Sequence, residues 1–172
     1  MIVVEPACDA DVEGIAEVHV AAWQRAYQGL LPAEVLAAQS VERRTEAWTS
    51  QLRDAGVAAW VSRDSRGIIN GFVAAGASRD ADAEPSTGEV YAVYVHPDAW
   101  GSGAGHALVS SASASLADDY EAATLWVLAG NDRACRFYER QGWRPDGSQR
   151  EEARGAAVVN EARYCASLRP RR

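Results

Sequence analysis

Apolar and polar positions change their spacing several times along this chain, and the changes predict an alternation of strands and helices. Residues 2–4, 58–63 and 67–77 have β-type character, and the residues "DSRG" between the last two predict a hairpin with antiparallel pairing. Between the first two segments, apolar residues recur with helical spacing behind Asp9, which is the predicted cap: Ile15, Val18, Ala22, Ala26. Two shorter helical stretches follow, at residues 34–38 and 41–52.

The middle of the chain predicts a strand, a turn, a helix and a second strand. Residues 89–95 alternate as a strand, and Gly101, Gly103 and Gly105 follow within five positions. A stripe of small residues then predicts a helix: Ala104, Ala107, Leu108, Ser111, Ala112, Leu116. Residues 124–128 form the second apolar strand, roughly thirty residues after the first, which is the separation of a parallel β-α-β unit.

The last third of the chain predicts one more helix and two weaker strands. Asn131 or Asp132 is expected to cap the helix and Gly142 to end it, before β-type stretches at residues 143–153 and 157–168. The polar segment 78–88 reads as an exposed loop that is too short for an interdomain linker. The closing residues "RPRR", 169–172, are expected to be frayed.

Length and composition bound the class of protein. A chain of 172 residues that is 48% hydrophobic fits one globular domain spanning residues 1–172. The net charge of -7 argues against nucleic acid as a partner, because binding many phosphates requires a basic surface. The first residues resemble no signal or transit peptide, and no apolar run approaches the length of a membrane span, so a cytoplasmic protein without a membrane partner is expected.

Cysteine and histidine give no sign of a disulfide framework or a metal site. Cys8, Cys135 and Cys165 are an odd number without C-x-x-C spacing and are predicted to be free thiols. His19, His96 and His106 are scattered, without the pairing that metal-binding motifs show. No metal is therefore expected.

The glycine turn "GSGAG" at residues 101–105 lacks the residues that common nucleotide-binding loops need. A Walker loop requires a lysine after its last glycine, where this chain has His106, and His106 also occupies the third glycine position of a Rossmann fingerprint. A glycine turn that opens a helix still exposes unpaired N–H groups at the positive end of a dipole, which suits a diphosphate. The alternative is a tight strand-to-helix connection with close packing.

A second motif, N-x-x-A-x-x-F-Y-x-x-x-G-W, runs from Asn131 to Trp143. Together with "EVYAVYVHP" and "GSGAG", in the same order and spacing, it resembles the GNAT superfamily of N-acetyltransferases. The likeness is strong over residues 89–143 and elsewhere rests mainly on element order. It implies an α/β fold with a mixed, mostly antiparallel sheet of about seven strands, splayed between strands 4 and 5 and flanked by about four helices. It also implies that acetyl-CoA binds in the splay.

The resemblance implies roles for individual positions around the splay. The glycine turn would cradle the diphosphate of acetyl-CoA, backbone groups of the preceding strand would pair with the pantetheine arm, and Asn131 would add a side-chain contact. The family usually begins this turn with Arg or Gln, so Trp100 leaves one phosphate contact in question. The positions assigned to the co-substrate are Val93, Tyr94, Val95, Trp100, Gly101, Ser102, Gly103, Ala104, Gly105, His106, Asn131, Ala134 and Tyr138.

Two residues are the candidates for proton transfer. Tyr138 resembles the family's general acid, which protonates the departing thiolate, although its helical spacing is equally that of a core tyrosine. Glu89 heads the strand before the turn, where several family members have a catalytic glutamate, and it would accept a proton from the attacking amine. The alternative for Glu89 is a solvent-facing position at the strand edge.

The acceptor of the acetyl group is expected to be a primary amine on a small molecule or a peptide N-terminus. Aromatic residues are the candidates for its pocket, because cations bind to aromatic faces: Trp23, Tyr27, Tyr91 and Trp126, with Trp60. Helix packing is the alternative for Trp23 and Tyr27. The expected activity is direct acetyl transfer within a ternary complex of protein, acetyl-CoA and amine. A homodimer is compatible with this expectation. The rivals are a catalytically silent acetyl-CoA sensor or scaffold and a mononucleotide-binding protein.

Overall fold

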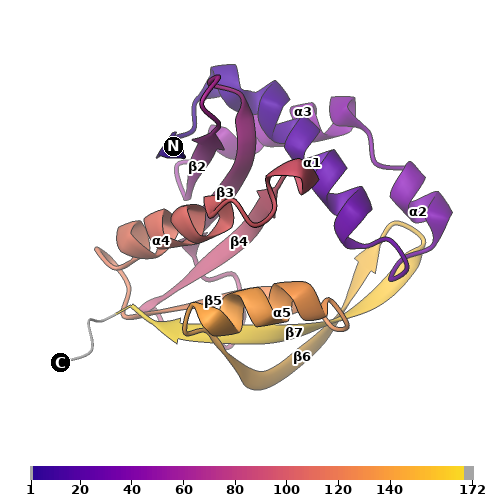
Figure 1. The fold of residues 1–172 in the computed structure, drawn as a ribbon. Helices are drawn as coiled ribbons and strands as arrows, with labels where there is room; N and C mark the ends of the chain where they lie inside the picture. Colours follow the sequence, from indigo (N-terminus) through magenta and orange to yellow (C-terminus); the bar gives the residue numbers. More distant parts are fainter. Residues whose placement is uncertain (1, 169–172) are drawn as a thin grey trace.

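The computed structural model describes residues 2–168, which fold around one seven-stranded mixed sheet (Figure 1). Every neighbouring pair of strands is antiparallel except β4 and β5. The strands in sheet order are β1 (Val3–Pro6), β2 (Val57–Arg63), β3 (Ile69–Ala77), β4 (Thr87–Val95), β5 (Ala122–Leu128), β7 (Ala157–Ser167) and β6 (Arg144–Arg154). The predicted hairpin and the predicted parallel unit are therefore both confirmed.

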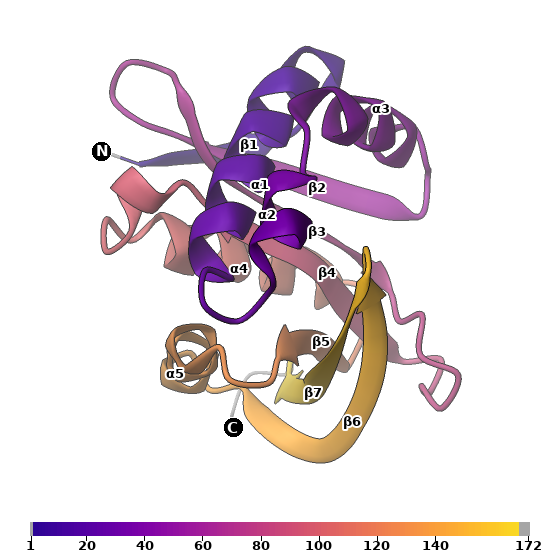
Figure 2. The same cartoon turned by 90° about the vertical axis from the view of Figure 1, so that its right-hand side faces the viewer.

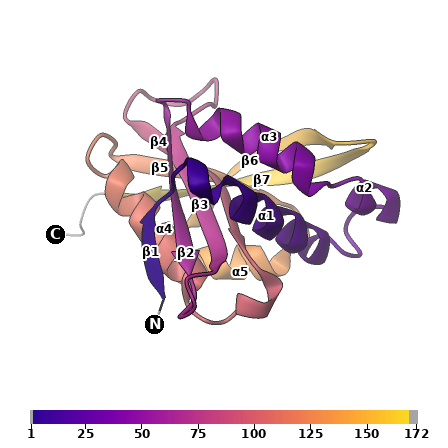
Figure 3. The ribbon, with the colours of Figure 1, turned by 90° about the horizontal axis from the view of Figure 1, so that it is seen from above.

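Helices cover both faces of the sheet (Figure 3). On one face, α1 and α3 pack against each other and against β2 and β3, while α4 packs on the other face of the same strands and α5 lies on that side against β5. The α-helices of the described residues are α1 (Val12–Ala26), α2 (Ala33–Ala37), α3 (Val41–Leu52), α4 (Ala104–Leu116) and α5 (Asp132–Arg140). Short 3-10 turns occupy Asp9–Asp11 and Pro97–Ala99.

The predicted cap of the first helix is wrong, and that of the last is right. Asp9 begins a 3-10 turn, and its carboxylate lies 3.5 Å from Arg53, while Asp11 accepts a hydrogen bond from the Cys8 N–H at 2.9 Å. Asp11 thus satisfies the open backbone donor ahead of α1. Asn131 caps α5 by accepting from the Ala134 N–H at 3.2 Å, as predicted. Gly142 follows with a left-handed φ of 90°.

The sheet opens between β4 and β5. These two strands pair only at Thr87–Ala122, Gly88–Ala123 and Glu89–Thr124, and their facing edges separate beyond that point (Figure 2). The pairing of β3 with β4 skips Tyr91, which marks a β-bulge in β4 next to the opening. A bulge increases local bending and twist, so it turns β4 away from β5. The splay that the family resemblance implies is present.

The two halves of the sheet are joined at the far side of the opening as well. The hairpin of β6 and β7 arches toward α2 (Figures 1 and 2), where Val159 packs with Val35, Leu31 and Trp23 in one buried cluster. None of the helices within residues 2–168 has the length and apolarity needed to cross a membrane. The predicted frayed tail, 169–172, lies outside the described residues.

Candidate active site

A cavity of about 660 Å³ occupies the opening between β4 and β5. Its walls come from the bulged strand β4, the glycine turn, α5, β5 and the arching hairpin. Most of the residues predicted to bind the co-substrate line it: Val93, Tyr94, Val95, Trp100, Gly101, Gly103, Gly105, His106, Asn131, Ala134 and Tyr138. Ser102 and Ala104 are not among the lining residues. Ser102 instead accepts from the Ala104 N–H at 3.3 Å, and Ala104 is fully buried beneath the turn.

The glycine turn has a backbone that only glycine adopts easily. Gly101 and Gly103 have φ values of 82° and 93°, so a side chain at either position would be strained. At Gly105, a Cβ atom would approach the Phe137 ring to 3.1 Å, so α4 and α5 meet closely here. The first N–H groups of α4 have no intrahelical acceptor, and Gly103, Gly105 and His106 line the cavity at this point. The turn therefore allows α4 and α5 to pack closely, and it also leaves backbone N–H donors at the cavity.

Trp100, which stands where the family usually has Arg or Gln, brings a cation to the turn indirectly. Its indole Nε1 donates to the Val95 carbonyl at 2.7 Å, which fixes the ring at the mouth of the cavity. The Arg133 guanidinium lies over this ring, 3.2 Å from its centroid, and Arg133 also lines the cavity. The positive charge at the turn is thus supplied from α5. The same indole occupies the Val95 carbonyl, one of the backbone groups expected to pair with the pantetheine arm.

Tyr138 lies on the cavity wall in the last turn of α5. It is 9% exposed and packs against Phe137 and Trp143, with ring centroids 5.1 and 6.3 Å away. Burial raises the pKa of Tyr138 well above its usual value, with smaller contributions from Tyr94 and Cys135. A tyrosine hydroxyl is protonated at neutral pH even at its ordinary pKa of about 10, and this increase leaves it so. The packing of the ring is thus observed, and the residue lines the cavity, while the role of its hydroxyl as an acid stays a prediction.

Glu89 is buried at the narrow end of the opening, where β4 and β5 still pair. It is 6% exposed, so the solvent-facing alternative is wrong. Its Oε2 accepts from the Arg79 N–H at 2.8 Å. Burial raises the pKa of Glu89, the Arg79 N–H opposes that shift, and the negative charge of Asp80 adds to it. A carboxylate with a raised pKa that lines a cavity is suited to accept a proton.

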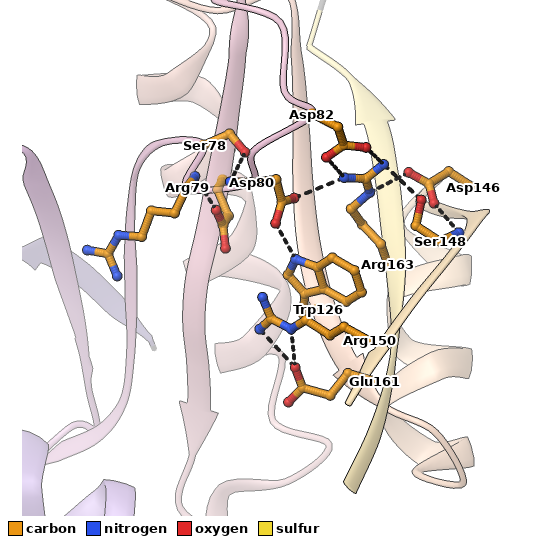
Figure 4. Close-up of polar contacts among 11 residues, drawn as sticks. Ser78, Arg79, Asp80, Asp82, Trp126, Asp146, Ser148, Arg150, Glu161 and Arg163 are labelled. Atoms are coloured by element: carbon orange, nitrogen blue, oxygen red, sulfur yellow. Dashed lines mark hydrogen bonds and ion pairs between the residues drawn. The ribbon is translucent and has the colours of Figure 1, made fainter. Parts of the chain in front are cut away.

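The loop between β3 and β4 is held in place by a cluster of charged residues that it shares with the C-terminal hairpin (Figure 4). Asp80 accepts from the Trp126 indole at 2.9 Å and from Arg163 at 3.2 Å, and Arg163 also binds Asp82 and Asp146, each at 2.7 Å. Residues 146–148 form an irregularity in β6 that places Asp146 beside Arg163. The segment 78–88 was predicted to be an exposed loop, but the Asp80 side chain is only 9% exposed. The loop is anchored because the C-terminal hairpin supplies Arg163.

The aromatic residues predicted for the acceptor pocket divide into two groups. Tyr27, Tyr91 and Trp126 line the cavity, and the hydroxyl groups of Tyr27 and Tyr94 lie 3.5 Å apart. Trp23 is 3% exposed and packs in the cluster beneath the hairpin, so helix packing describes it. Trp60 packs against the core between the sheet and α4, away from the cavity lining.

Several charged residues of the cavity were not predicted. Arg133 and Arg140 come from α5, and Arg150, Arg154 and Glu161 come from the hairpin. Glu161 is 5% exposed, and a buried carboxylate on a strand gives no sequence signal by itself. The one available sign was the spacing of Arg150 and Arg154 on a strand, where residues four apart share a face.

Neither the cysteines nor any metal-binding cluster contributes to the cavity. The three cysteines are free, as predicted, and none of them is among the lining residues. Within residues 2–168, no group of His, Cys, Asp and Glu side chains is arranged to hold a metal ion. The cavity lining instead includes the two predicted proton-transfer residues, Tyr138 and Glu89, and several arginines.

Comparison with known proteins agrees with this architecture. Residues 17–143 match the acetyltransferase (GNAT) family, and the chain belongs to that family. It is 30% identical over 132 residues to the uncharacterized N-acetyltransferase YuaI of Bacillus subtilis, covering 76% of this chain and 74% of that protein.

Solved structures of low sequence identity share the fold. The PaiA N-acetyltransferase of Thermoplasma acidophilum, in complex with coenzyme A, superposes with a TM-score of 0.75 at 15% identity over 94% of this chain and 98% of its own. The acetyltransferase yncA of Salmonella typhimurium, described as putative and solved with acetyl-CoA, gives 0.70 at 20% identity over 100% and 96%.

Proposed function

We propose that this protein transfers the acetyl group of acetyl-CoA directly to a primary amine. The observation that carries the proposal is the single cavity that joins a glycine turn, a protonated buried tyrosine and a buried carboxylate with a raised pKa. Family membership and structural relatives solved with coenzyme A or acetyl-CoA support the same choice of co-substrate.

The residues present fit acetyl-CoA at the turn. Diphosphate oxygens would accept from the open N–H groups at the start of α4, and Arg133 would add a charge-assisted contact from its position over Trp100. The unpaired edge of β4 beyond Glu89 offers backbone groups to the pantetheine amides. The thioester would then lie in the opening near Tyr138.

Each proton in the reaction has a residue to accept or donate it. The amine nitrogen attacks the thioester carbonyl, and Glu89 takes the amine's proton directly or through water. As the carbon–sulfur bond breaks, the thiolate takes the Tyr138 proton. Solvent then returns a proton to the tyrosinate and accepts the proton held by Glu89, which restores both residues. A low-polarity site disfavours a thiolate, which raises its affinity for that proton. Direct transfer needs no acyl-enzyme, and none of the cysteines lines the cavity.

A panel of amines tests the proposal by the thiol released from acetyl-CoA. We expect release only when a suitable primary amine is present, with small metabolites and short peptides both included. The rival is a sensor or scaffold that binds acetyl-CoA without turnover. Tight calorimetric binding of acetyl-CoA, with no thiol release from any amine, would favour that rival. Binding of ATP in preference to coenzyme A would favour the mononucleotide-binding alternative.

A further inference from the structure

The wall of the cavity formed by the C-terminal hairpin carries a pair of arginines on one buried carboxylate. Arg150 and Arg154 bind opposite oxygens of Glu161, at 2.8 and 2.6 Å. The Glu161 side chain is 6% exposed, whereas those of the two arginines are 38% and 37% exposed. Both guanidinium groups line the cavity, and Arg150 lies over the Trp126 ring at 4.2 Å (Figure 4). Glu161 thus holds two cations next to each other at the cavity surface.

The part of this wall that lines the cavity carries a net positive charge. Arg150 and Arg154 together with Glu161 and Glu152 sum to zero, but Glu152 is not among the lining residues. The other acidic neighbour, Glu152, is 38% exposed and lies 3.4 Å from Arg154 and 3.9 Å from Arg150. Exposed pairs of this kind are weak. Arg44, which is outside the cavity lining, donates to the neutral Gln39 at 2.7 Å; burial lowers the pKa of Arg44, and the nearby charge of Arg154 adds to that decrease. This end of the cavity therefore favours an anion.

The two guanidinium groups keep hydrogen-bond donors that these contacts do not use. A guanidinium has five N–H donors. Arg150 uses Nε and Nη2 on Glu161, and Arg154 uses Nη2 on Glu161 and Nη1 on Glu152. In the contacts described, Nη1 of Arg150 and Nε of Arg154 remain available. Glu89 lines the same cavity from β4, and although burial raises its pKa, it lies close enough to Arg150 for that charge to oppose the increase.

We propose that the acetyl acceptor is an amine that also carries a carboxylate, such as an amino acid. Its carboxylate binds Arg150 and Arg154, and its amino group faces Glu89. This inference rests on the proposed acetyltransferase function. A polycationic amine fits the site less well, because the two carboxylates that line the cavity are Glu89, which is needed for proton transfer, and Glu161, which two arginines already occupy.

Matched acceptors test the proposal: L-amino acids and their α-amides, each with saturating acetyl-CoA. In the pair that is acetylated fastest, the amino acid should have a kcat/KM at least ~10-fold higher than that of its amide. A charge-assisted arginine contact corresponds to about that factor. The amide has the less basic amine, so amine basicity alone would favour the amide. Arg154→Gln should remove the preference for the acid, and Arg154→Lys should restore part of it. Arg66→Gln, at an exposed site in the β2–β3 turn, should leave both acceptors unchanged. Equal kcat/KM for acid and amide in the parent would overturn the proposal.

A binding measurement separates this inference from the proposed function. Calorimetry with the same acids and amides, on protein saturated with coenzyme A, should show acid binding that Arg154→Gln weakens ~10-fold. Thermal unfolding establishes that the variant is folded. Acid binding without acetylation of any amine would support the carboxylate site and contradict the proposed function. Acetylation of amines that lack a carboxylate, without detectable acid binding, would support the proposed function and contradict the carboxylate site.

Discussion

Removing the hydroxyl of Tyr138 separates a structural contribution of this residue from a chemical one, because phenylalanine keeps the ring that packs against Phe137 and Trp143. If the hydroxyl protonates the thiolate, Tyr138→Phe should lower the single-turnover rate by ~10²-fold, the lower end of the range for general acid catalysis. The dissociation constant of acetyl-CoA should stay close to the parental value.

Tyr164 is a matched control for this variant. It is 5% exposed in the same core, lies outside the cavity lining, and donates to Glu139 at 3.2 Å. Tyr164→Phe should cost ~1 kcal/mol of unfolding free energy through the lost hydrogen bond and leave the rate unchanged. If Tyr138→Phe behaves like this control, Tyr138 is a packing residue and another group protonates the thiolate.

The pH dependence of the rate should report on Glu89 and its neighbour Asp80. Glu89 must be deprotonated to accept a proton, so its raised pKa places the acidic limb of the profile above the usual range of a glutamate. The negative charge of Asp80 contributes to that increase, so Asp80→Asn should move the limb to lower pH. Asp82→Asn is the control: it weakens a second contact of Arg163, from an exposed position, and should leave the acidic limb in place. A limb that moves equally in both variants would assign the effect to loop anchoring.

The sequence predicted individual residues well where their role depends only on the backbone of neighbouring residues. The asparagine cap of α5 is of this kind. The glycine turn and Glu89 line the cavity, but their roles came from the family resemblance and stay predictions. Burial of the Asp80 side chain was not predictable, because Arg163 reaches its loop from the other end of the chain. The prediction that Trp23 lines the cavity is wrong for a similar reason: its side chain packs with Val159 of the hairpin, more than a hundred positions away in the sequence.

At the scale of elements, α5 contributes both the candidate acid and the cation at the glycine turn. Arg133→Gln should weaken acetyl-CoA binding ~10-fold at low salt, with a smaller effect at high salt, because a charge-assisted phosphate contact is lost. Arg136 lies on the same helix, is exposed and does not line the cavity, so Arg136→Gln serves as the control. An unchanged affinity in Arg133→Gln at both salt concentrations would show that the stacked guanidinium does not reach the phosphates.

Most elements followed from the spacing of apolar residues, whereas the opening between β4 and β5 came only from the family resemblance. Periodicity predicts that two strands are parallel, but it does not show that their pairing ends after Glu89 and Thr124. The bulge at Tyr91, which turns β4, could not be predicted either, because the alternation of apolar and polar residues along β4 is nearly unbroken there. The arching of β6 and β7 over the cavity depends on the irregularity at residues 146–148 and on contacts with α2, both of which are long-range effects.

In the molecule as a whole, the two halves of the sheet contribute different parts of the site. The N-terminal half provides Glu89 and the glycine turn, and the C-terminal half provides Tyr138 and the arginine pair. Their positions relative to each other are held by the short β4–β5 pairing, by Arg163 with its three aspartates, and by the packing of the hairpin against α2. The opening between them holds the cavity of about 660 Å³ in which these parts meet.

Direct transfer within this cavity is the central claim, and mass spectrometry of a quenched single turnover tests it. Protein in excess is mixed with acetyl-CoA carrying a ¹³C-labelled acetyl group, with and without an amino acid. The account predicts labelled N-acetyl product only when the amino acid is present, and an unlabelled polypeptide at every time point in both reactions. A labelled polypeptide that forms without the amino acid and passes its label on would contradict direct transfer, and labelled acetyl-CoA that stays intact with every amine would contradict acetyl transfer altogether.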